Sequence, residues 1–369
     1  MVRGCSEVPP SPFGRLWPQL LATYTPRLMK IKILCTLGPA SLNPDILRGL
    51  DERGTDLYRI NLSHTAVDQI EPTIDLIRSV SQIPISLDTE GAQVRCGFVV
   101  DDLVLEEGRE IVLTAEPLIG DRSRLTLWPR VAFETLAPGA LLGIDFDGAA
   151  LRVGSIGEGR AIANVERGGR VRSNRAVKID PPPELPALSD KDRAAIDVGA
   201  RLGITYYALS FASHARDVDL IRGLAPAGAH IMAKIENRPG VRNMDGIIEA
   251  SDSVIIDRGD LSHEVPFESV PYYQKAIVRR ANRGNRPVYV ATNLLESLVT
   301  SPTPTIAEAN DIANTLLDGV HGLVLAAETA IGVDPLGSVD LVRRAIDAFE
   351  RASEGALLEA DRNHTGITG

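Results

Sequence analysis

Eight short runs rich in β-branched and other apolar residues recur along the chain, and helix-like periodicity follows them. This alternation is typical of βαβ units, in which helices connect parallel strands. Eight such units predict a (β/α)8 TIM barrel, an α/β fold. The predicted strands are residues 31–36, 56–61, 83–88, 204–210, 230–236, 253–257, 287–293 and 322–328.

Start and stop signals mark several of the predicted helices. Asn43-Pro44 opens a helix that Gly54 ends, and a second helix runs from Thr305 to Leu317. Asparagine or threonine before the first turn, proline at the first position and glycine after the last turn are the usual helix boundaries.

One connection is far too long for a single crossover helix. Residues 89–203 separate the third predicted strand from the fourth. From residue 97 to 178 the pattern changes to short alternating runs with turn signals such as Asp147-Gly148 and Gly168-Gly169. We therefore expect an all-β domain inserted between strand 3 and helix 3, where it would act as a lid that excludes water from the barrel mouth.

These patterns divide the chain into predicted regions. Met29 stands directly before the first strand, so the segment before it is either a flexible arm or an over-long gene start. The regions are an N-terminal arm at 1–29, the barrel at 30–90 and 184–354, the inserted β lid at 91–183 and a C-terminal tail at 355–369.

Charge and cysteine content exclude several classes of protein. The 39 Lys and Arg face 49 Asp and Glu, a net charge of −10, which argues against a nucleic-acid or membrane-surface role. No apolar run approaches the ~18 residues of a membrane span. Cys5, Cys35 and Cys96 form no C-x-x-C pair, so neither a disulfide framework nor a zinc ribbon fits and we expect a reducing, cytoplasmic location.

Polar residues are unusually frequent where the predicted strands end, which is where a TIM barrel builds its active site. Any one of them can simply mark the point at which the chain leaves the core. All of them together favour a functional site. They are Thr36, Arg59 with Asn61 and Ser63, Asp88 with Thr89, Ser210, Lys234 with Glu236, Asp260, Thr292 and Glu328.

Two acids in this set indicate a divalent metal site. Lys234 and Glu236 share one strand face because they are two residues apart. Glu236 and Asp260 come from neighbouring strands, and close carboxylates repel unless a cation lies between them. Mg²⁺ or Mn²⁺ suits such an all-oxygen site. The competing interpretation is a salt bridge of either acid to Lys234 or Arg258.

Two further groups suggest other ligands. Asn61, Ser63, Asp88 and Thr89 offer oxygen atoms suited to a monovalent cation, although this indication is weak when taken alone. Gly259 has no β-carbon, so the backbone N–H groups beside it can closely approach an anion such as a substrate carboxylate. An ordinary turn is the alternative there.

Seven motifs follow one another in order along the chain. They are Cys35-Thr-Leu-Gly-Pro-Ala-Ser41, Arg59-Ile-Asn-Leu-Ser-His64, Asp88-Thr-Glu-Gly91, Lys234-Ile-Glu-Asn-Arg-Pro-Gly-Val241, Arg258-Gly-Asp-Leu261, Ala291-Thr-Asn-Leu-Leu-Glu-Ser297 and Glu328-Thr-Ala330. Together they resemble the pyruvate kinase family over about residues 30–352. The resemblance implies a barrel with a lid, without the family's C-terminal regulatory domain and its usual sugar-phosphate control.

The resemblance also implies a reaction, namely phosphoryl transfer between phosphoenolpyruvate and ADP through a metal-stabilised enolpyruvate. Lys234 would stabilise the transferring group and the enolate oxygen, Arg59 would contact the phosphate, and Thr292 would stand near the carbon that is protonated. The implied ligands are Glu236 and Asp260 for Mg²⁺ (or Mn²⁺); Asn61, Ser63, Asp88 and Thr89 for K⁺; Arg59, Lys234, Gly259, Asp260 and Thr292 for the substrate; and Asn61, His64, Arg95 and Arg175 for the nucleotide.

The chain departs from the family pattern close to the phosphates. Glu90 and Ile331 stand where lysines are usual, Gln93 replaces a glutamate of K⁺-dependent members, and Ala326-Ala327 replaces Ser-Gly. Each lost charge-assisted contact could cost roughly 1.5–3 kcal/mol. Nucleotide use could therefore be much weaker than in the family.

These departures keep two other functions open. One is a nucleotide-independent lyase, aldolase or decarboxylase that forms a metal-stabilised pyruvate enolate. The other is a non-catalytic regulatory paralogue, which the joint survival of the metal pair and Lys234 disfavours. Small-molecule substrates and a barrel-to-barrel homodimer are the partners we expect, with neither nucleic acid nor membrane.

Overall fold

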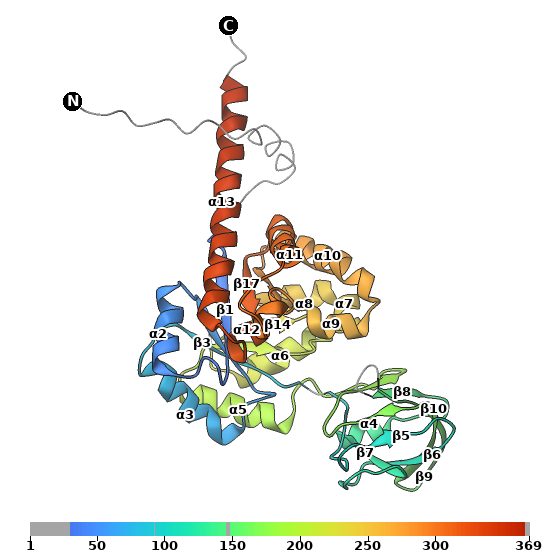
Figure 1. The fold of residues 1–369 in the computed structure, drawn as a ribbon. Coiled ribbons are helices and arrows are strands. Elements are labelled where there is room, and N and C mark those ends of the chain that lie inside the picture. Colours follow the sequence, from blue (N-terminus) through green and yellow to red (C-terminus); the bar gives the residue numbers. More distant parts are fainter. Residues whose placement is uncertain (1–29, 92, 145–147, 366–369) are drawn as a thin grey trace, which may run out of the picture. The chain divides into compact units, whose positions relative to one another are not determined.

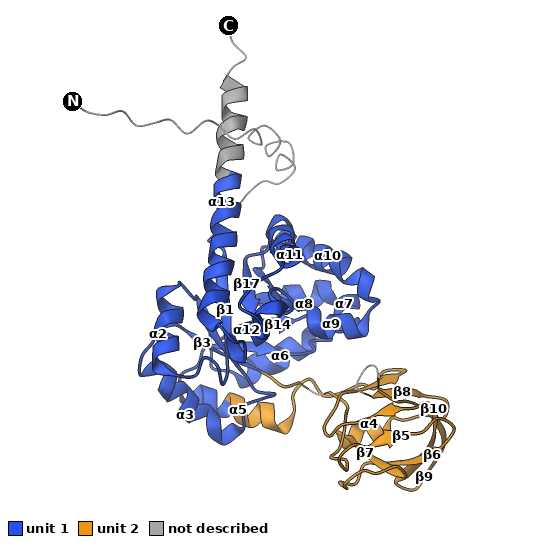
Figure 2. Cartoon of the chain, viewed as in Figure 1, with its two compact units in different colours: residues 1–88, 197–369 blue, residues 89–196 orange. Residues whose placement is uncertain are grey.

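The computed structural model describes residues 30–365 except 92 and 145–147, drawn as a ribbon in Figure 1. The chain divides into two compact units, one formed by Met1–Asp88 with Asp197–Gly369 and the other by Thr89–Ile196 (Figure 2). The predicted arm at 1–29, the last four residues of the predicted tail and Asp147 of one predicted turn lie outside the described residues.

The described part of the first unit contains a closed barrel of parallel strands. Each strand pairs with its sequence neighbour in the barrel, and the first pairs with the last. Every strand overlaps one of the eight predicted runs, which confirms the predicted TIM barrel. The strands are β1 (Lys32–Leu37), β2 (Leu57–Asn61), β3 (Ile85–Asp88), β13 (Tyr206–Leu209), β14 (His230–Lys234), β15 (Ser253–Asp257), β16 (Val288–Ala291) and β17 (Gly322–Leu325).

The strands read as continuous apolar runs because both faces of the barrel wall are buried. One buried cluster combines side chains from most of the strands, among them Leu34, Met232, Ile255 and Val324, and fills the barrel interior. The barrel is therefore a packed core, and chemistry is confined to its ends.

Helices follow the strands along the chain and pack on the outside of the barrel. The predicted boundaries are confirmed: Asn43 Oδ1 accepts a hydrogen bond from Ile46 N, and Thr305 forms a capping box with Glu308. The helices are α2 (Pro44–Glu52), α3 (Val67–Arg78), α5 (Asp190–Arg201), α6 (Ala215–Leu224), α7 (Arg238–Arg242), α8 (Met244–Ala250), α9 (Arg258–Glu264), α10 (Val270–Arg283), α11 (Ile306–Leu317), α12 (Ala327–Ala330) and α13 (Pro335–Thr365), with short 3₁₀ turns at Phe267–Ser269 and Glu296–Val299.

The second unit is built mainly from strands, as the alternating pattern predicts. Its larger sheet has the order β12-β8-β9-β10-β6-β7-β4, and β11 pairs with β5. A separate hydrophobic core, which includes Leu113, Leu127, Leu142 and Val165, holds this unit together. The elements are β4 (Arg95–Cys96), β5 (Val104–Leu105), β6 (Glu110–Thr114), β7 (Arg124–Trp128), α4 (Arg130–Glu134), β8 (Leu141–Ile144), β9 (Ala150–Gly157), β10 (Arg160–Arg167), β11 (Gly169–Arg170) and β12 (Val177–Asp180).

The β unit enters the chain after β3 and returns through α5, so the insertion interrupts the third βα unit as predicted. Among the described helices, none combines the length and the apolar character that a membrane span requires.

Candidate active site

A buried lysine lies at the centre of the carboxyl end of the barrel. Lys234, the last residue of β14, has its ammonium nitrogen 3.2 Å from Glu236 Oε2 and 3.5 Å from Asp257 Oδ2. Asp88 Oδ2 lies 3.7 Å from the same nitrogen, which also donates a hydrogen bond to Ser210 Oγ at 3.2 Å. The parallel strands all end on this side, so residues far apart in sequence converge here.

The electrostatics of these groups follow from burial and from the unequal numbers of charges. Burial by itself would lower the pKa of Lys234, but the carboxylates of Asp88, Glu236 and Asp257 raise it above the ordinary value. Burial raises the pKa of Glu236 well above its usual range, against the influence of Lys234. Although burial acts in the opposite direction, Lys234 and Arg59 hold the pKa of Asp257 below its usual value.

Three acids in this region are close enough to share one metal ion. Glu236, Asp257 and Asp260 each offer a carboxylate oxygen, and these atoms lie within 4.8 Å of one another. Glu236 is fully buried, and its Oε1 accepts a hydrogen bond from Phe211 N at 2.8 Å. Its Oε2 forms no hydrogen bond within the described residues, despite the nearby Lys234 ammonium. An all-oxygen set with a buried, unused acceptor fits a hard divalent cation.

One of the salt bridges considered as an alternative to the metal site is also present. Glu236 pairs with Lys234, so the ion pair and the acidic cluster coexist. Arg258 instead binds Asp311 at 2.7 Å and donates to the carbonyl oxygens of Thr292 and Asn293. Arg258 therefore holds the loop after β16 in place.

Arg59 on β2 presents buried hydrogen-bond donors. The residue is 3% exposed, and its Nη1 lies 3.4 Å from Asp88 Oδ2. Neither Nε nor Nη1 forms a hydrogen bond within the described residues. Buried guanidinium donors without acceptors are costly, so this arrangement suits an anionic ligand.

Thr292 and Gly259 form a tight connection between the loops after β16 and β15. Thr292 has φ +66°, a left-handed conformation that β-branched residues rarely adopt. Its Oγ1 accepts from Gly259 N at 2.7 Å and donates to Asp257 Oδ1 at 2.8 Å. A β-carbon on Gly259 would lie 3.2 Å from that Oγ1, so glycine keeps the space open.

The backbone donors that the sequence assigned to a substrate carboxylate already have partners in the protein. Gly259 N donates to Thr292, and Asp260 N donates to Asp257 Oδ1 over a long 3.5 Å. A substrate carboxylate would have to share or replace these contacts.

Three of the residues predicted for K⁺ lie at adjoining positions, because Asn61 and Asp88 are register partners on β2 and β3. Asn61 Oδ1 accepts from Ser63 N at 2.9 Å in the loop after β2. Asp88 faces Arg59 and Lys234, so protein cations already neutralise its charge. The fourth predicted ligand, Thr89, begins the second unit.

The residues predicted for the nucleotide lie in both units. His64 is exposed after β2, whereas Arg95 and Arg175 belong to the second unit. Arg95 donates to Gln93 Oε1 at 2.6 Å and to the carbonyl of Asn174 at 3.0 Å. These arginines are therefore positioned by the β unit and not by the barrel.

Glu90 and Ile331, two of the residues that depart from the family pattern, differ in their surroundings. Glu90 forms an ion pair with Lys191 at 3.0 Å within the second unit. Ile331 is 60% exposed after α12. An exposed apolar side chain offers no charge to a phosphate at this position.

Two of the strand-end residues bind backbone groups. Glu328 accepts from Leu295 N and Ala326 N, and Thr36 Oγ1 donates to the carbonyl of Leu325. Glu328 and Thr36 therefore have a structural role, since backbone groups of the loops that they join satisfy their polar atoms.

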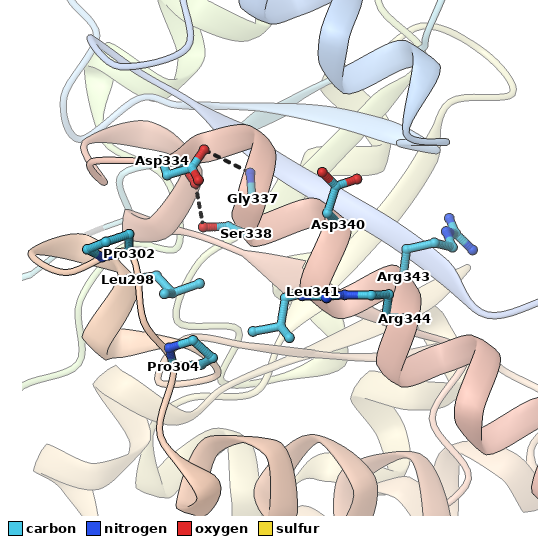
Figure 3. Close-up of a pocket in the computed structure, with 10 residues that line it drawn as sticks. All are labelled: Leu298, Pro302, Pro304, Asp334, Gly337, Ser338, Asp340, Leu341, Arg343 and Arg344. Atoms are coloured by element: carbon cyan, nitrogen blue, oxygen red, sulfur yellow. Dashed lines mark hydrogen bonds between the residues drawn. The ribbon is translucent and has the colours of Figure 1, made fainter.

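A separate cavity of about 490 Å³ lies beside the start of α13 (Figure 3). Pro302 and Pro304 line one side, and Leu341 and Arg344 on α13 line another. The cavity shares no lining residue with the Lys234 cluster, so it is not part of the candidate active site.

Asp257 is the site residue that the sequence analysis missed. It is the last residue of a correctly predicted strand, whereas the motif that follows predicts Asp260. The available signal was its place at the carboxyl end of a barrel strand, where a carboxylate is positioned for chemistry.

Comparisons with known proteins agree on one family. The family model described as pyruvate kinase, barrel domain, matches residues 28–339. The chain is 37% identical over 345 residues to a pyruvate kinase of Methylorubrum extorquens. The matched region covers 91% of this chain and 72% of that protein. A pyruvate kinase of Agrobacterium vitis is 36% identical, with 87% and 68% covered, and one of Geobacillus stearothermophilus is 34% identical, with 88% and 58% covered.

Proposed function

Because the chain belongs to the pyruvate kinase family and is a pyruvate kinase-like phosphotransferase, we propose that it transfers a phosphoryl group between phosphoenolpyruvate and ADP. The observation that carries this proposal is the buried arrangement of Lys234 among carboxylates, with Arg59 beside the same oxygen of Asp88. Nε and Nη1 of Arg59 form no hydrogen bond within the described residues. Phosphoryl transfer depends mainly on positioning and on stabilising charge, and these groups supply both.

Cations are part of the proposal. Glu236 and Asp260 would hold Mg²⁺ or Mn²⁺, which when bound offsets negative charge on the phosphoryl and enolate oxygens. A K⁺ site at Asn61, Ser63, Asp88 and Thr89 would require Asp88 to serve a third cation besides its two protein partners.

The residues of the barrel then have distinct roles. Lys234 places a fixed ammonium beside the transferring group and the enolate oxygen, where negative charge grows in the transition state. Arg59 binds the phosphate through its free donors. The Thr292 hydroxyl, oriented by Gly259 and Asp257, stands near the carbon that gains a proton.

A coupled assay with phosphoenolpyruvate, ADP, Mg²⁺ and K⁺ tests this function directly. We expect Mg²⁺-dependent formation of ATP. No ATP, together with Mg²⁺-dependent entry of solvent deuterium into the pyruvate methyl group, would contradict the kinase and favour the lyase-type reaction. The Glu90–Lys191 pair and the exposed Ile331 are the features that favour that second candidate. Folded, metal-loaded protein that does neither would be a non-catalytic paralogue.

A reducing, cytoplasmic environment is part of the same proposal. Cys35 and Cys96 are both buried and form no disulfide among the described residues, and burial raises the pKa of Cys35 to about 12. The Cys35 thiol is therefore not prepared for disulfide exchange, since the thiolate is the reactive form.

The paired metal site makes a first prediction. Glu236→Gln and Asp260→Asn should each weaken Mn²⁺ binding by about 10- to 100-fold, because each removes a charge-assisted contact of roughly 1.5–3 kcal/mol. Isothermal titration calorimetry measures the affinity. Unchanged affinity in either folded variant would exclude that acid as a ligand.

A further inference from the structure

Asp257 supplies a carboxylate that no motif of the sequence assigns to the metal site. We propose that Asp257 is a third carboxylate ligand of the divalent cation, beside Glu236 and Asp260. This inference rests on the metal-dependent function proposed above. One oxygen atom from each acid lies within 4.8 Å of the others, a spacing that a single ion can bridge.

The Asp257 side chain is held in a fixed orientation. Its Oδ1 accepts from Thr292 Oγ1 at 2.8 Å and from Asp260 N at 3.5 Å, where it caps the start of α9. Its Oδ2 lies 3.5 Å from Lys234 Nζ, the same ammonium that Glu236 Oε2 approaches at 3.2 Å. Both carboxylates therefore contact the Lys234 ammonium, and each also offers an oxygen atom within 4.8 Å of one from Asp260.

The balance of charge supports a ligand at this position. Two cations and four carboxylates meet at the carboxyl end of the barrel: Arg59, Lys234, Asp88, Glu236, Asp257 and Asp260. With every acid ionised, as metal ligands are, the site is short of two positive charges, which is the charge of one divalent ion. Without Asp257 the deficit would be only one. Buried carboxylates in excess of their cations are unfavourable, so bound metal would stabilise the full set.

A second observation is independent of this balance. Glu236 Oε2 is fully buried and forms no hydrogen bond within the described residues. Buried acceptors in folded proteins are normally satisfied, and one that is not indicates a missing ligand. Glu236 is one of the three acids that offer ligand atoms within 4.8 Å of one another.

Three protein carboxylates would give the ion half of an octahedral set of oxygen ligands before any substrate arrives. We therefore expect Mn²⁺ to bind the substrate-free protein. Asp257 would thus contribute to metal affinity and not to the contacts with the phosphate.

Calorimetric titration of Mn²⁺ into the substrate-free full chain tests this assignment. Asp257→Asn keeps an oxygen that can accept the Thr292 hydrogen bond but removes the charge, and Asp257→Ala removes both. We expect about 10- to 100-fold weaker binding in each. The Mn²⁺ electron paramagnetic resonance spectrum should also change, because the ligand set changes.

Asp252→Asn is the matched control. Asp252 precedes β15 at its opposite end and pairs with Arg222 at 3.0 Å, so its removal subtracts the same charge away from the cluster. Its Mn²⁺ affinity should equal that of the unmodified chain. Circular dichroism and thermal unfolding establish that each variant is folded.

Unchanged Mn²⁺ affinity in folded Asp257→Asn and Asp257→Ala would overturn the inference, as would failure of the unmodified chain to bind Mn²⁺. The assignment of Asp257 and the proposed function can be contradicted separately. Weaker Mn²⁺ binding in both variants, with no ATP formed by the unmodified chain, would support Asp257 as a ligand and contradict the kinase. ATP formation by the unmodified chain, with unchanged Mn²⁺ affinity in the variants, would support the kinase and contradict Asp257 as a ligand.

Discussion

Replacing Lys234 by methionine should reduce phosphoryl transfer by at least about 10²- to 10³-fold in kcat. The ammonium lies within 3.7 Å of three carboxylates. Negative charge that grows on the transferring group would then lack its fixed counter-charge. Steady-state assays of the purified variant with phosphoenolpyruvate and ADP measure the effect.

The variant should also be less stable, by about 3–5 kcal/mol, because it leaves buried carboxylates without their cation. The pKa of Lys234 is raised above 10.5, so its contribution to stability is fully present below pH 10.5 and is lost only as the pH rises further. Denaturant unfolding near neutral pH therefore reports the whole contribution.

Metal binding separates lost catalysis from lost folding in this variant. Removing one positive charge makes the acidic cluster more negative, so Lys234→Met should bind Mn²⁺ at least as tightly as the unmodified chain. Lys275→Met is a suitable control, because Lys275 pairs with Asp318 outside the cluster. Activity comparable to the unmodified chain in folded Lys234→Met would refute the role of the lysine.

Arg59→Gln should lower kcat/KM for phosphoenolpyruvate by about 10²- to 10⁴-fold, since two charge-assisted contacts of roughly 1.5–3 kcal/mol each are lost. Arg59 is buried with Nε and Nη1 free of hydrogen bonds within the described residues, which is the arrangement expected of a phosphate ligand. Pyruvate carries no phosphate. Mg²⁺-dependent exchange of its methyl protons should therefore change little in this variant.

The comparison of the two reactions identifies what Arg59 does. An equal loss of phosphoryl transfer and proton exchange would mean that Arg59 acts through Asp88, 3.4 Å away, and not on the phosphate. Arg48→Gln provides a control, because Arg48 pairs with Asp45 in an exposed i,i+3 contact on α2. That variant should match the unmodified chain in both assays.

Much of the architecture could be predicted because it depends on local patterns. A strand such as β15 is an unbroken apolar run, and α11 begins at a threonine with a glutamate three positions later. Such signals lie in nearby residues of the sequence, so they can be read without knowledge of the tertiary contacts. The change of period after β3 located the inserted sheet in the same way.

The site was harder to predict because its members come from different strands. Lys234 and Glu236 both reach the cluster, as their spacing in the predicted strand indicates, although β14 ends at Lys234 and Glu236 lies just beyond it. Thr36 and Glu328 looked equally promising but bind backbone groups of neighbouring loops. Position at a strand end does not distinguish a ligand from a loop contact, since both need polar atoms at the same place.

The sequence by itself determined the number of barrel strands, the place of the insertion and the family, because periodicity and ordered motifs are properties of consecutive residues. Only the tertiary structure decided which charges share a site. Asp88 contacts both Arg59 and Lys234, and Asp257 joins Glu236 and Asp260. Such partnerships depend on the stagger of strands around the closed barrel, which sets the distances between side chains that no spacing along the chain records.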